Sequence, residues 1–330
     1  MKEFDVYGIG AALVDTEITL TDEELIAFGI EKGVMTLVDE VRQRDLIAHL
    51  DSHLVVAQRA SGGSSANSVM AVSSFGGKAY YSCKVADDEN GHFYLDDLTK
   101  AGVCHAGSQH LPEGITGKCL VLITPDAERT MNTYLGISET ICSKNLDFPA
   151  IAGSEYIYIE GYLVTSPTGK AAAIEGRQYA EQVGTKTAFS LSDPGMVAFF
   201  REGLQAMMGE KVDLLFCNRD EAFSWTGETA LDLALEGLKK TAKTFVITLG
   251  AEGAVAFDGE NIHTILPTLV EAVDTNGAGD MFAGAFLYGI THGMDYRAAG
   301  MLASNACARV VAQFGARLPV EQHRSILASL

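Results

Sequence analysis

The second half of the chain alternates short apolar runs with longer segments of helical spacing. Strands are predicted at 155–161, 186–192, 212–218 and 244–250, and helices at 168–183, 195–208, 219–226 and 230–241. A predicted hairpin at 254–266 leads to a stretch at 273–286 that turns from polar to apolar, and two closing helices follow. Strands that alternate with helices of this length indicate a parallel sheet covered by helices on both faces.

The first half of the chain contains extra strands that break this alternation. It begins with a buried strand and a more polar extended piece at 5–15, and helices are predicted at 21–30, at 64–77 and from 88 to Gly102. Thr21 and Glu24 have the spacing of a capping box at the first of these helices. Extra strands are predicted at about 11–20, 33–38, 54–60, 116–124 and 129–135. We expect them to form a small sheet at the edge of the main one, placed to close over a ligand at the carboxyl ends of the parallel strands.

Composition narrows the class of protein. The 330 residues are enough for one large domain or a core with a smaller appendage, and 47% of them are hydrophobic. A formal net charge of −19 argues against a nucleic-acid partner, because no basic excess is left to neutralise a phosphate backbone. A single nucleotide needs only a local group of N–H donors and is not excluded.

The cysteines, the histidines and the first residues bear on location. The six cysteines form no C-x-x-C pair and are typical of free thiols in a reducing compartment. The eight histidines show no metal-ligand spacing, so we expect no structural zinc site. The first 15 residues lack the pattern of a signal peptide, and no apolar window approaches the about 18 residues of a membrane span. We therefore expect a cytoplasmic protein without a membrane partner.

Two stretches resemble nucleotide-binding motifs but are incomplete. GIGAAL at 8–13 begins like the dinucleotide fingerprint, but Leu13 stands where the third glycine belongs. SPTGKA at 166–171 contains the Gly-Lys pair of a P-loop, but Val164 replaces its first glycine and Ala171 replaces the Ser or Thr that would hold magnesium. Neither a dehydrogenase nor a P-loop enzyme is predicted.

The stretch DTNGAGD at 274–280 carries the strongest chemical signal. A helix N-terminus leaves several N–H groups without partners and bears partial positive charge. The small residues Gly277, Ala278 and Gly279 would let an anion approach those N–H groups closely. Asp280 would stand beside the anion, within reach of a hydroxyl that attacks phosphorus. The alternative is that Asp280 only satisfies the helix dipole, but a plain cap requires neither glycine.

Three motifs together resemble the ribokinase (PfkB-type) family of sugar and nucleoside kinases. DTNGAGD is similar to the family's C-terminal signature, SGGSSANSVMAVSSFGG at 61–77 to its glycine pair before a helix, and CNRDE at 217–221 to its Asn-x-x-Glu element. They occur in the family's order over nearly the whole chain. The resemblance implies a three-layer α/β/α fold with a mainly parallel central sheet, in one catalytic unit over 1–330. Its β-sheet lid would be built mainly from about 11–60 and 114–137.

Within that family, several stretches are more similar to adenosine kinases, bacterial ones in particular, than to sugar kinases. These are GAALVD at 10–15, ERTMNTYLG at 128–136, EGYLVTSP at 160–167 and LSDPGMVAFF at 191–200. Ala11 departs from the pattern, because animal adenosine kinases have an Asn there near the ligand. The base preference therefore stays open.

The resemblance implies transfer of the γ-phosphoryl group of ATP to a primary hydroxyl, which is the 5′-hydroxyl if the acceptor is a nucleoside. Asp280 matches the general base, and Gly277, Ala278 and Gly279 match the anion hole. Asp15 matches the residue that accepts hydrogen bonds from two ribose hydroxyls, although a strand-end Asp is an equal alternative without the family. The other residues expected around the sugar are Gly62, Gly63 and Asn67, and for SGGSS alone a plain turn would be the simpler interpretation.

The resemblance also assigns residues to the phosphate donor and to the lid. Asn218 and Glu221 would organise Mg²⁺ through water, and their spacing equally fits a helix-capping pair. Arg129 would reach the transferring phosphate from the lid, or else be a solvated hairpin arginine. The adenine of ATP is expected over 248–254 and the last helices, near Thr248, Gly250, Gly253, Ala303 and Asn305. A purine slot is expected from Cys119, Leu135, Tyr162 and Phe199, with core packing as the alternative, and a K⁺ site near Asp274 and Gly315.

The sequence leaves three hypotheses for the whole protein. The first is an ATP-dependent purine nucleoside kinase, adenosine kinase above all, with a small-molecule partner and a monomeric or homodimeric state. The second is a sugar kinase of the same family acting on ribose, fructose or a related sugar. The third is a catalytically silent nucleotide-binding protein, which would have no need of a base at Asp280.

Overall fold

Two sheets organise the computed structural model, which describes residues 2–50, 58–107 and 110–329. The larger sheet has eight strands in the order β13-β12-β11-β10-β9-β8-β1-β5. Its strands are β1 (Phe4–Ile9), β5 (Ala79–Ser82), β8 (Ser154–Glu160), β9 (Lys186–Ser190), β10 (Val212–Asn218), β11 (Ala242–Thr248), β12 (Ala254–Phe257) and β13 (Ile262–Ile265). The pairs from β5 to β11 are parallel, and the β11–β12 and β12–β13 pairs are antiparallel.

Helices cover both faces of this sheet, because alternate residues of each strand are buried on opposite sides. In β8, Tyr156 and Tyr158 belong to one apolar cluster, and Ile157 and Ile159 belong to the other. The first cluster is covered by α3 (Ser64–Ser74), α4 (Glu89–Lys100), α10 (Ala278–Thr291), α11 (Tyr296–Val311) and α12 (Val320–Ala328). The second is covered by α5 (Phe148–Ala152), α6 (Pro167–Val183), α7 (Pro194–Met208), α8 (Arg219–Thr226) and α9 (Leu231–Leu238). The three-layer α/β/α arrangement expected from the sequence is confirmed.

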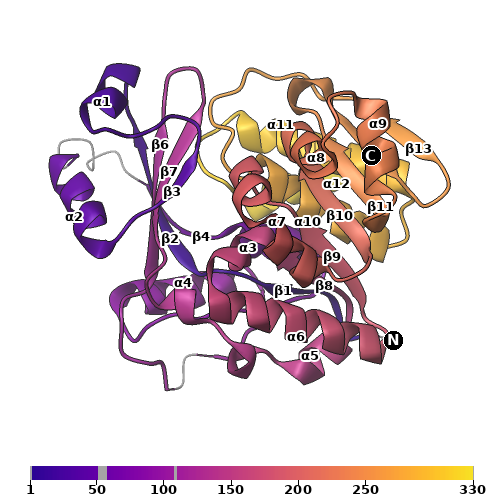
Figure 1. The fold of residues 1–330 in the computed structure, drawn as a ribbon, viewed down its shortest axis with the longest axis horizontal. Helices are drawn as coiled ribbons and strands as arrows, with labels where there is room; N and C mark the ends of the chain where they lie inside the picture. The colour runs from indigo at the N-terminus through magenta and orange to yellow at the C-terminus, as the bar shows by residue number, and fades with distance from the viewer. Residues whose placement is uncertain (1, 51–57, 108–109, 330) are drawn as a thin grey trace.

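The smaller sheet stands beside this layered body (Figure 1) and contains the extra strands of the first half. Its order is β3-β7-β6-β2-β4, with β3 (Met35–Leu37), β7 (Arg129–Tyr134), β6 (Gly117–Ile123), β2 (Leu13–Thr19) and β4 (Gln58–Gly62). The sheet and its two helices, α1 (Asp22–Ala27) and α2 (Glu40–His49), are called the lid below. The expected strand at 54–60 lies partly outside the described residues, since only 58–60 are described.

The lid has its own apolar face. Ile18 and Leu120 pack with Leu25 of α1 and Leu46 of α2 on one side of the sheet. The opposite side presents a second set of apolar residues toward the larger sheet, among them Cys119 and Met131. The capping box expected at Thr21 and Glu24 is present at the start of α1. Helix α2 was not expected from the sequence.

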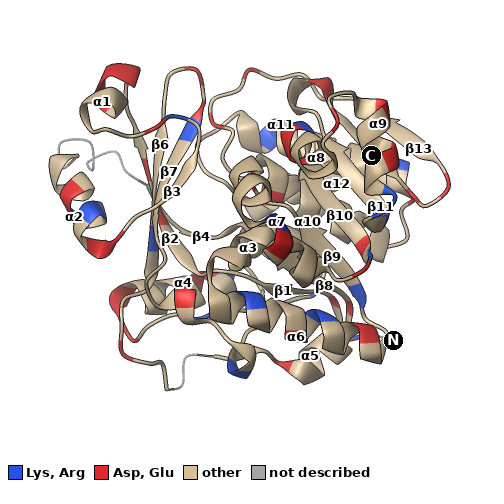
Figure 2. Cartoon of the chain, in the orientation of Figure 1, with Lys and Arg blue, Asp and Glu red and all other residues tan. Residues whose placement is uncertain are grey.

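Most connections between these elements are short, but a longer stretch without helix or strand, 266–277, leads from β13 to α10. Acidic residues outnumber basic ones in both parts, and the basic residues are scattered over the molecule (Figure 2). Among the described residues, no helix combines the length and apolar character needed to cross a membrane.

Candidate active site

A cavity of about 460 Å³ lies between the lid and the carboxyl ends of the parallel strands. Four neighbouring strands, β8 to β11, each place their last residue in its wall: Glu160, Ser190, Asn218 and Thr248. The carboxyl ends of parallel strands are where open α/β sheets bind ligands. The sequence-predicted residues that line the cavity are Asp15, Gly63, Asn67, Cys119, Arg129, Leu135, Tyr162, Asn218, Glu221, Thr248, Gly277, Ala278, Gly279 and Asp280. Gly62, Phe199, Gly250, Gly253, Asp274, Asn305 and Gly315 are not in its wall.

The start of α10 is shaped for close approach by a ligand. Gly277 occupies the N-cap with φ 72°, and no side chain caps the helix. A Cβ on Gly277 would lie 2.5 Å from the side chain of Ala316, so glycine is required there. A Cβ on Gly279 would meet nothing within 4 Å, so this position opens onto free space. The first N–H groups of α10 are therefore free of side-chain partners and accessible from the cavity.

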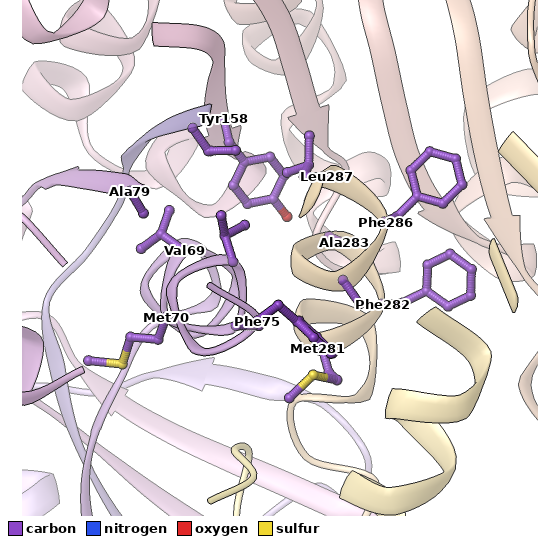
Figure 3. Close-up of a cluster of buried hydrophobic side chains, with 14 of the residues drawn as sticks. Val69, Met70, Phe75, Ala79, Tyr158, Met281, Phe282, Ala283, Phe286 and Leu287 are labelled. Atoms are coloured by element: carbon purple, nitrogen blue, oxygen red, sulfur yellow. The ribbon is translucent and has the colours of Figure 1, made fainter. Parts of the chain in front are cut away.

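The helix behind these N–H groups is fixed by apolar packing. Met281, Phe282 and Ala283 of α10 belong to the same buried apolar cluster as Val69 and Met70 of α3, and the two helices lie side by side (Figure 3). A Cβ on Gly284 would lie 2.4 Å from the carbonyl oxygen of Ser68, so the two helices are in close contact. Donors on a rigid helix need no reorganisation when they stabilise charge.

Asp280 does not cap its own helix. Its Oδ1 accepts a hydrogen bond of 2.6 Å from Ser64 Oγ, and its Oδ2 accepts one of 3.0 Å from Asn67 Nδ2. Both donors come from the first turn of α3, which brings together residues more than 200 positions apart. Burial raises the pKa of Asp280, and the hydrogen bonds from Ser64 and Asn67 lower it in part. The carboxylate is thus a held, desolvated proton acceptor at the cavity wall.

Asp15 and Gly62 form one structural unit in the lid. Asp15 lies in β2 with its side chain buried, and burial, followed by the nearby charge of Glu17, raises its pKa to about 8. A Cβ on Gly62 in the neighbouring strand β4 would lie 2.0 Å from Asp15 Oδ2. Gly62 therefore makes room for Asp15 and does not itself face the cavity.

Asn67 has an unused acceptor at the same wall. Its Oδ1 is buried and has no hydrogen-bond partner within the described structure. Gly63, the N-cap of α3, has φ 99°, and a Cβ there would lie 2.3 Å from the carbonyl oxygen of Ala11. The glycine pair thus serves two close contacts, and the free Asn67 oxygen is available to a donor on a ligand.

Glu160 is a site residue that the sequence interpretation missed. Its Oε1 accepts a hydrogen bond of 2.7 Å from the N–H of Ala11, and its Oε2 accepts one of 2.7 Å from the N–H of Ser65. Burial raises its pKa to about 7, although both hydrogen bonds oppose the shift. It joins the link between β1 and β2 to the start of α3. The signal was a lone acid at the carboxyl end of a predicted parallel strand.

Asn218 and Glu221 form a reciprocal capping box at the start of α8. Glu221 N donates to Asn218 Oδ1 at 2.8 Å, while Asn218 N and Nδ2 donate to the two Glu221 carboxylate oxygens at 3.0 and 2.7 Å. Burial raises the pKa of Glu221 to about 7. The capping interpretation is confirmed, and because both residues line the cavity it does not conflict with a role beside phosphates.

The lid contributes Arg129 and part of an apolar slot. Arg129 begins β7 and lines the cavity, as do Cys119 and Leu135. Tyr162 stands on the opposite wall, where its hydroxyl donates to the carbonyl oxygen of Ser192 at 3.1 Å. Phe199 was expected in this slot, but that prediction is wrong, since its side chain is 83% exposed and does not line the cavity. It lies on the solvent side of α7, five residues beyond the turn of that helix that reaches the cavity.

The residues expected around the donor's adenine lie mostly beyond the cavity. Thr248 is in its wall, whereas Asn305 Oδ1 accepts a hydrogen bond of 2.5 Å from Thr268 Oγ1. Gly253 has φ 92°, and a Cβ there would lie 2.2 Å from the carbonyl oxygen of Ile265, which gives this glycine a structural reason of its own. Gly250 has φ 60° with open space around it. Their role in binding ATP stays a prediction.

Asp274 and Gly315 do meet, as the cation prediction requires. Asp274 is fully buried, and its Oδ2 accepts a hydrogen bond of 2.9 Å from the N–H of Gly315. Its Oδ1 accepts one of 2.8 Å from the N–H of Asn276. A K⁺ site at this place stays a prediction.

Comparison with known proteins gives the same fold a family context. The family model described as "pfkB family carbohydrate kinase" matches residues 37–323. The crystal structure of an adenosine kinase from Sinorhizobium meliloti is 33% identical with a TM-score of 0.90, covering 99% of this chain and all of that one. A probable sugar kinase from Rhizobium etli is 31% identical with a TM-score of 0.89, and both chains are fully covered. The curated adenosine kinase of Saccharomyces cerevisiae is 26% identical over 334 residues, 95% of this chain and 96% of that protein.

Proposed function

Since the chain belongs to the pfkB family of carbohydrate kinases, we propose that it transfers the γ-phosphoryl group of ATP to the 5′-hydroxyl of a purine nucleoside, adenosine above all. As a member of this family it is a kinase that phosphorylates a hydroxyl group of a sugar or nucleoside, and the family implies ATP as the donor. The proposal concerns the acceptor and the residues that act on it.

The observation that carries the proposal is the setting of Asp280. Its carboxylate stands in the cavity wall, held by Ser64 and Asn67, at the N-terminus of a helix that has no side-chain cap. A proton acceptor beside a group of fixed N–H donors is what transfer of an anionic phosphoryl group to a hydroxyl requires.

The chemistry follows from these positions. Asp280 takes the proton of the acceptor hydroxyl as that oxygen bonds to the γ-phosphorus, and the bond to the β–γ bridging oxygen breaks to release ADP. The N–H groups of Gly277, Ala278 and Gly279 stabilise the charge on the transferring group, with Arg129 approaching from the lid. A general base typically contributes about 10²- to 10⁴-fold to the rate.

Two groups near Asp280 support a ribose-bearing acceptor. Asp15 can accept hydrogen bonds from two neighbouring hydroxyls, and the free Oδ1 of Asn67 can accept another. Hydroxyl groups of a ligand that donate to the buried Asp15 carboxyl group would favour its charged form, and the charged form accepts stronger hydrogen bonds. Both residues are close to Asp280 in the same wall, as a sugar carrying a reactive primary hydroxyl needs.

The apolar slot favours a base attached to that sugar. Cys119, Leu135 and Tyr162 line the cavity together with Leu13 and Met131. A free sugar would leave this apolar surface uncovered, whereas a purine ring would bury it. The adenosine kinase of Sinorhizobium meliloti, similar over the whole chain, supports the same choice.

The residues present fit a magnesium ion held mainly through water. Asn218 and Glu221 supply oxygen donors, and the described residues contain no cluster of three or more metal-binding side chains. Mg²⁺ commonly takes few protein ligands beside phosphates and water. When bound it would neutralise phosphate charge, and Asn218 and Glu221 would hold its water shell. Asp274 and Gly315 are the residues we propose near a monovalent cation.

The proposal is tested by ADP release with Mg-ATP over adenosine, inosine, guanosine, cytidine, ribose and fructose. We expect the highest kcat/KM with adenosine, and we expect Asp15→Asn to raise the acceptor KM more than it lowers kcat. Phosphorylation of free sugars alone would contradict the nucleoside assignment and leave the kinase assignment intact. ATP binding without transfer to any acceptor would instead favour a silent nucleotide-binding protein.

A further inference from the structure

The turn that precedes α10 is held from the lid by two consecutive side chains. Thr275 Oγ1 donates a hydrogen bond of 3.2 Å to the carbonyl oxygen of Ala127, between β6 and β7. Asn276 Nδ2 donates one of 3.3 Å to Glu17 Oε1 in β2. Two separate lid segments therefore contact the residues immediately before Gly277.

Asn276 is the residue through which this contact reaches the helix N-terminus. Its backbone N–H is fixed by Asp274 Oδ1 at 2.8 Å, and its side chain is fixed by Glu17. Asn276 is buried and lines the cavity, and Gly277 follows it directly as the N-cap of α10. A rotation of Asn276 would therefore turn the peptide that leads into the N–H groups of the predicted anion hole.

Glu17 itself does not line the cavity, and its carboxyl group is buried, which costs free energy when the group is charged. The charged groups that face it are Asp274 from the turn, Arg317 beyond α11 and, in its own strand, Asp15. Burial and then the charge of Asp274 raise the pKa of Glu17 to about 7. A carboxyl group kept beside another acid without ligand contact needs a reason, and its hydrogen bond to Asn276 supplies one.

We infer that Glu17 is a positioning residue for phosphoryl transfer, which through Asn276 holds the N–H groups at the start of α10 in their productive orientation. The inference rests on the proposed kinase function. It gives the lid residue Glu17 a role in holding the anion hole in place. Glu17 touches neither acceptor nor donor, and it acts only through Asn276.

The kinetic test compares Glu17→Ala with Glu17→Gln, using the acceptor that wild-type protein phosphorylates best. The amide oxygen of Gln can still accept from Asn276, so we expect Glu17→Gln to keep kcat within about 3-fold. Glu17→Ala loses the acceptor, and a hydrogen bond of this kind corresponds to a fall in kcat of about 10-fold or more. The acceptor KM should change less than about 3-fold in both. Glu23→Ala, the same change at an exposed lid position, is the control and should match wild type.

A transition-state mimic separates positioning from a general loss of folded protein. Binding of ADP with aluminium fluoride and acceptor should weaken about 10-fold in Glu17→Ala, while the number of acceptor sites per chain stays at the wild-type value. In a double-mutant cycle, Asn276→Ala combined with Glu17→Ala should cost no more than either alone. Additive losses, or equal damage from Glu17→Gln and Glu17→Ala, would overturn the inference.

Hydrogen exchange tests the contact without turnover. Amide exchange in a peptide spanning 274–279 should rise about 10-fold in Glu17→Ala and stay unchanged in Glu17→Gln and Glu23→Ala. Unchanged exchange in Glu17→Ala would refute the link between Glu17 and the turn. A wild-type protein that phosphorylates no acceptor would refute the proposed function alone, because the exchange comparison still decides the Glu17–Asn276 contact.

Discussion

Replacement of Asp280 by Asn separates folding from chemistry at this site. Ser64 Oγ and Asn67 Nδ2 now donate to the two carboxylate oxygens. In the variant, the amide oxygen can still accept from Ser64. Its NH₂ group would face the NH₂ of Asn67, but Asn67 can flip and offer Oδ1, which has no partner within the described structure. Every hydrogen bond is thus recoverable.

The expected magnitudes follow from this geometry. The free energy of unfolding of Asp280→Asn should stay within about 1 kcal/mol of wild type, since the hydrogen bonds are retained and a buried charge is removed. In contrast, kcat should fall about 10²- to 10⁴-fold, because an amide cannot take the hydroxyl proton. At about 1.36 kcal/mol per tenfold, that is a barrier higher by about 3–5 kcal/mol.

The assay is steady-state ADP release together with urea unfolding of the same preparations. Asp295→Asn is the matched control, because Asp295 caps α11 by accepting from Ala298 N and Asn caps equally well. It should leave both kcat and stability unchanged. A kcat for Asp280→Asn within tenfold of wild type would refute the general-base assignment. A loss of activity that runs parallel to a loss of folded protein would contradict the expectation that the Asn side chain keeps the hydrogen bonds to Ser64 and Asn67.

Three further outcomes are expected. In Gly62→Ala, the added Cβ would lie 2.0 Å from Asp15 Oδ2 and would displace that carboxylate. The acceptor KM should therefore rise at least about 10-fold while the affinity for ATP is kept, and titration with each ligand measures both. Burial raises the pKa of Glu160 from 4.5 to about 7, so the stability it contributes is complete below pH 4.5 and is lost as pH rises toward 7. Urea unfolding at pH 5, 6 and 7 should show that decline in the free energy of unfolding. Glu160→Gln should be less stable than wild type, but its stability should change less with pH. An equally steep decline in the variant would show that other groups cause it. Ser192 has φ 73°, and its Oγ accepts from Gly161 N at 2.8 Å. Ser192→Gly should therefore melt within a few degrees of wild type, because relief of about 1 kcal/mol of backbone strain offsets the lost bond, whereas Ser192→Ala should melt lower than Ser192→Gly.

Local patterns predicted most of the fold. The strand–helix alternation from residue 154 onward is reproduced nearly element by element, and helix α8 begins and ends where expected, at 219 and 226. Each strand has its own two-residue alternation and each helix its own start and stop signals, so neighbours in sequence are enough to locate them. Helix α2 was missed because its residues are mostly polar and only Gln43 and Leu46 are buried, which gives almost no apolar stripe to detect.

Site residues were predictable where glycine or capping chemistry marked them. The turn before α10 and the Asn218–Glu221 pair were visible because their geometry is set within a few residues. Glu160 and Ser64 carried no such mark, since a single Glu or Ser fits many roles. Phe199 was misplaced for the opposite reason, because a large apolar residue near a site motif still depends on which way its helix faces.

The sequence by itself determined where the chain forms strands, helices and tight glycine turns, and with them the kind of reaction that the DTNGAGD turn suits. Only the tertiary structure decided which residues from distant parts of the chain the acids at the site contact. Asp280 meets Ser64 and Asn67, and Glu17 meets Asn276, across more than 200 residues of chain. Such contacts depend on how separate elements pack at the carboxyl edge of a sheet, and no local spacing encodes which side chains will face one another there.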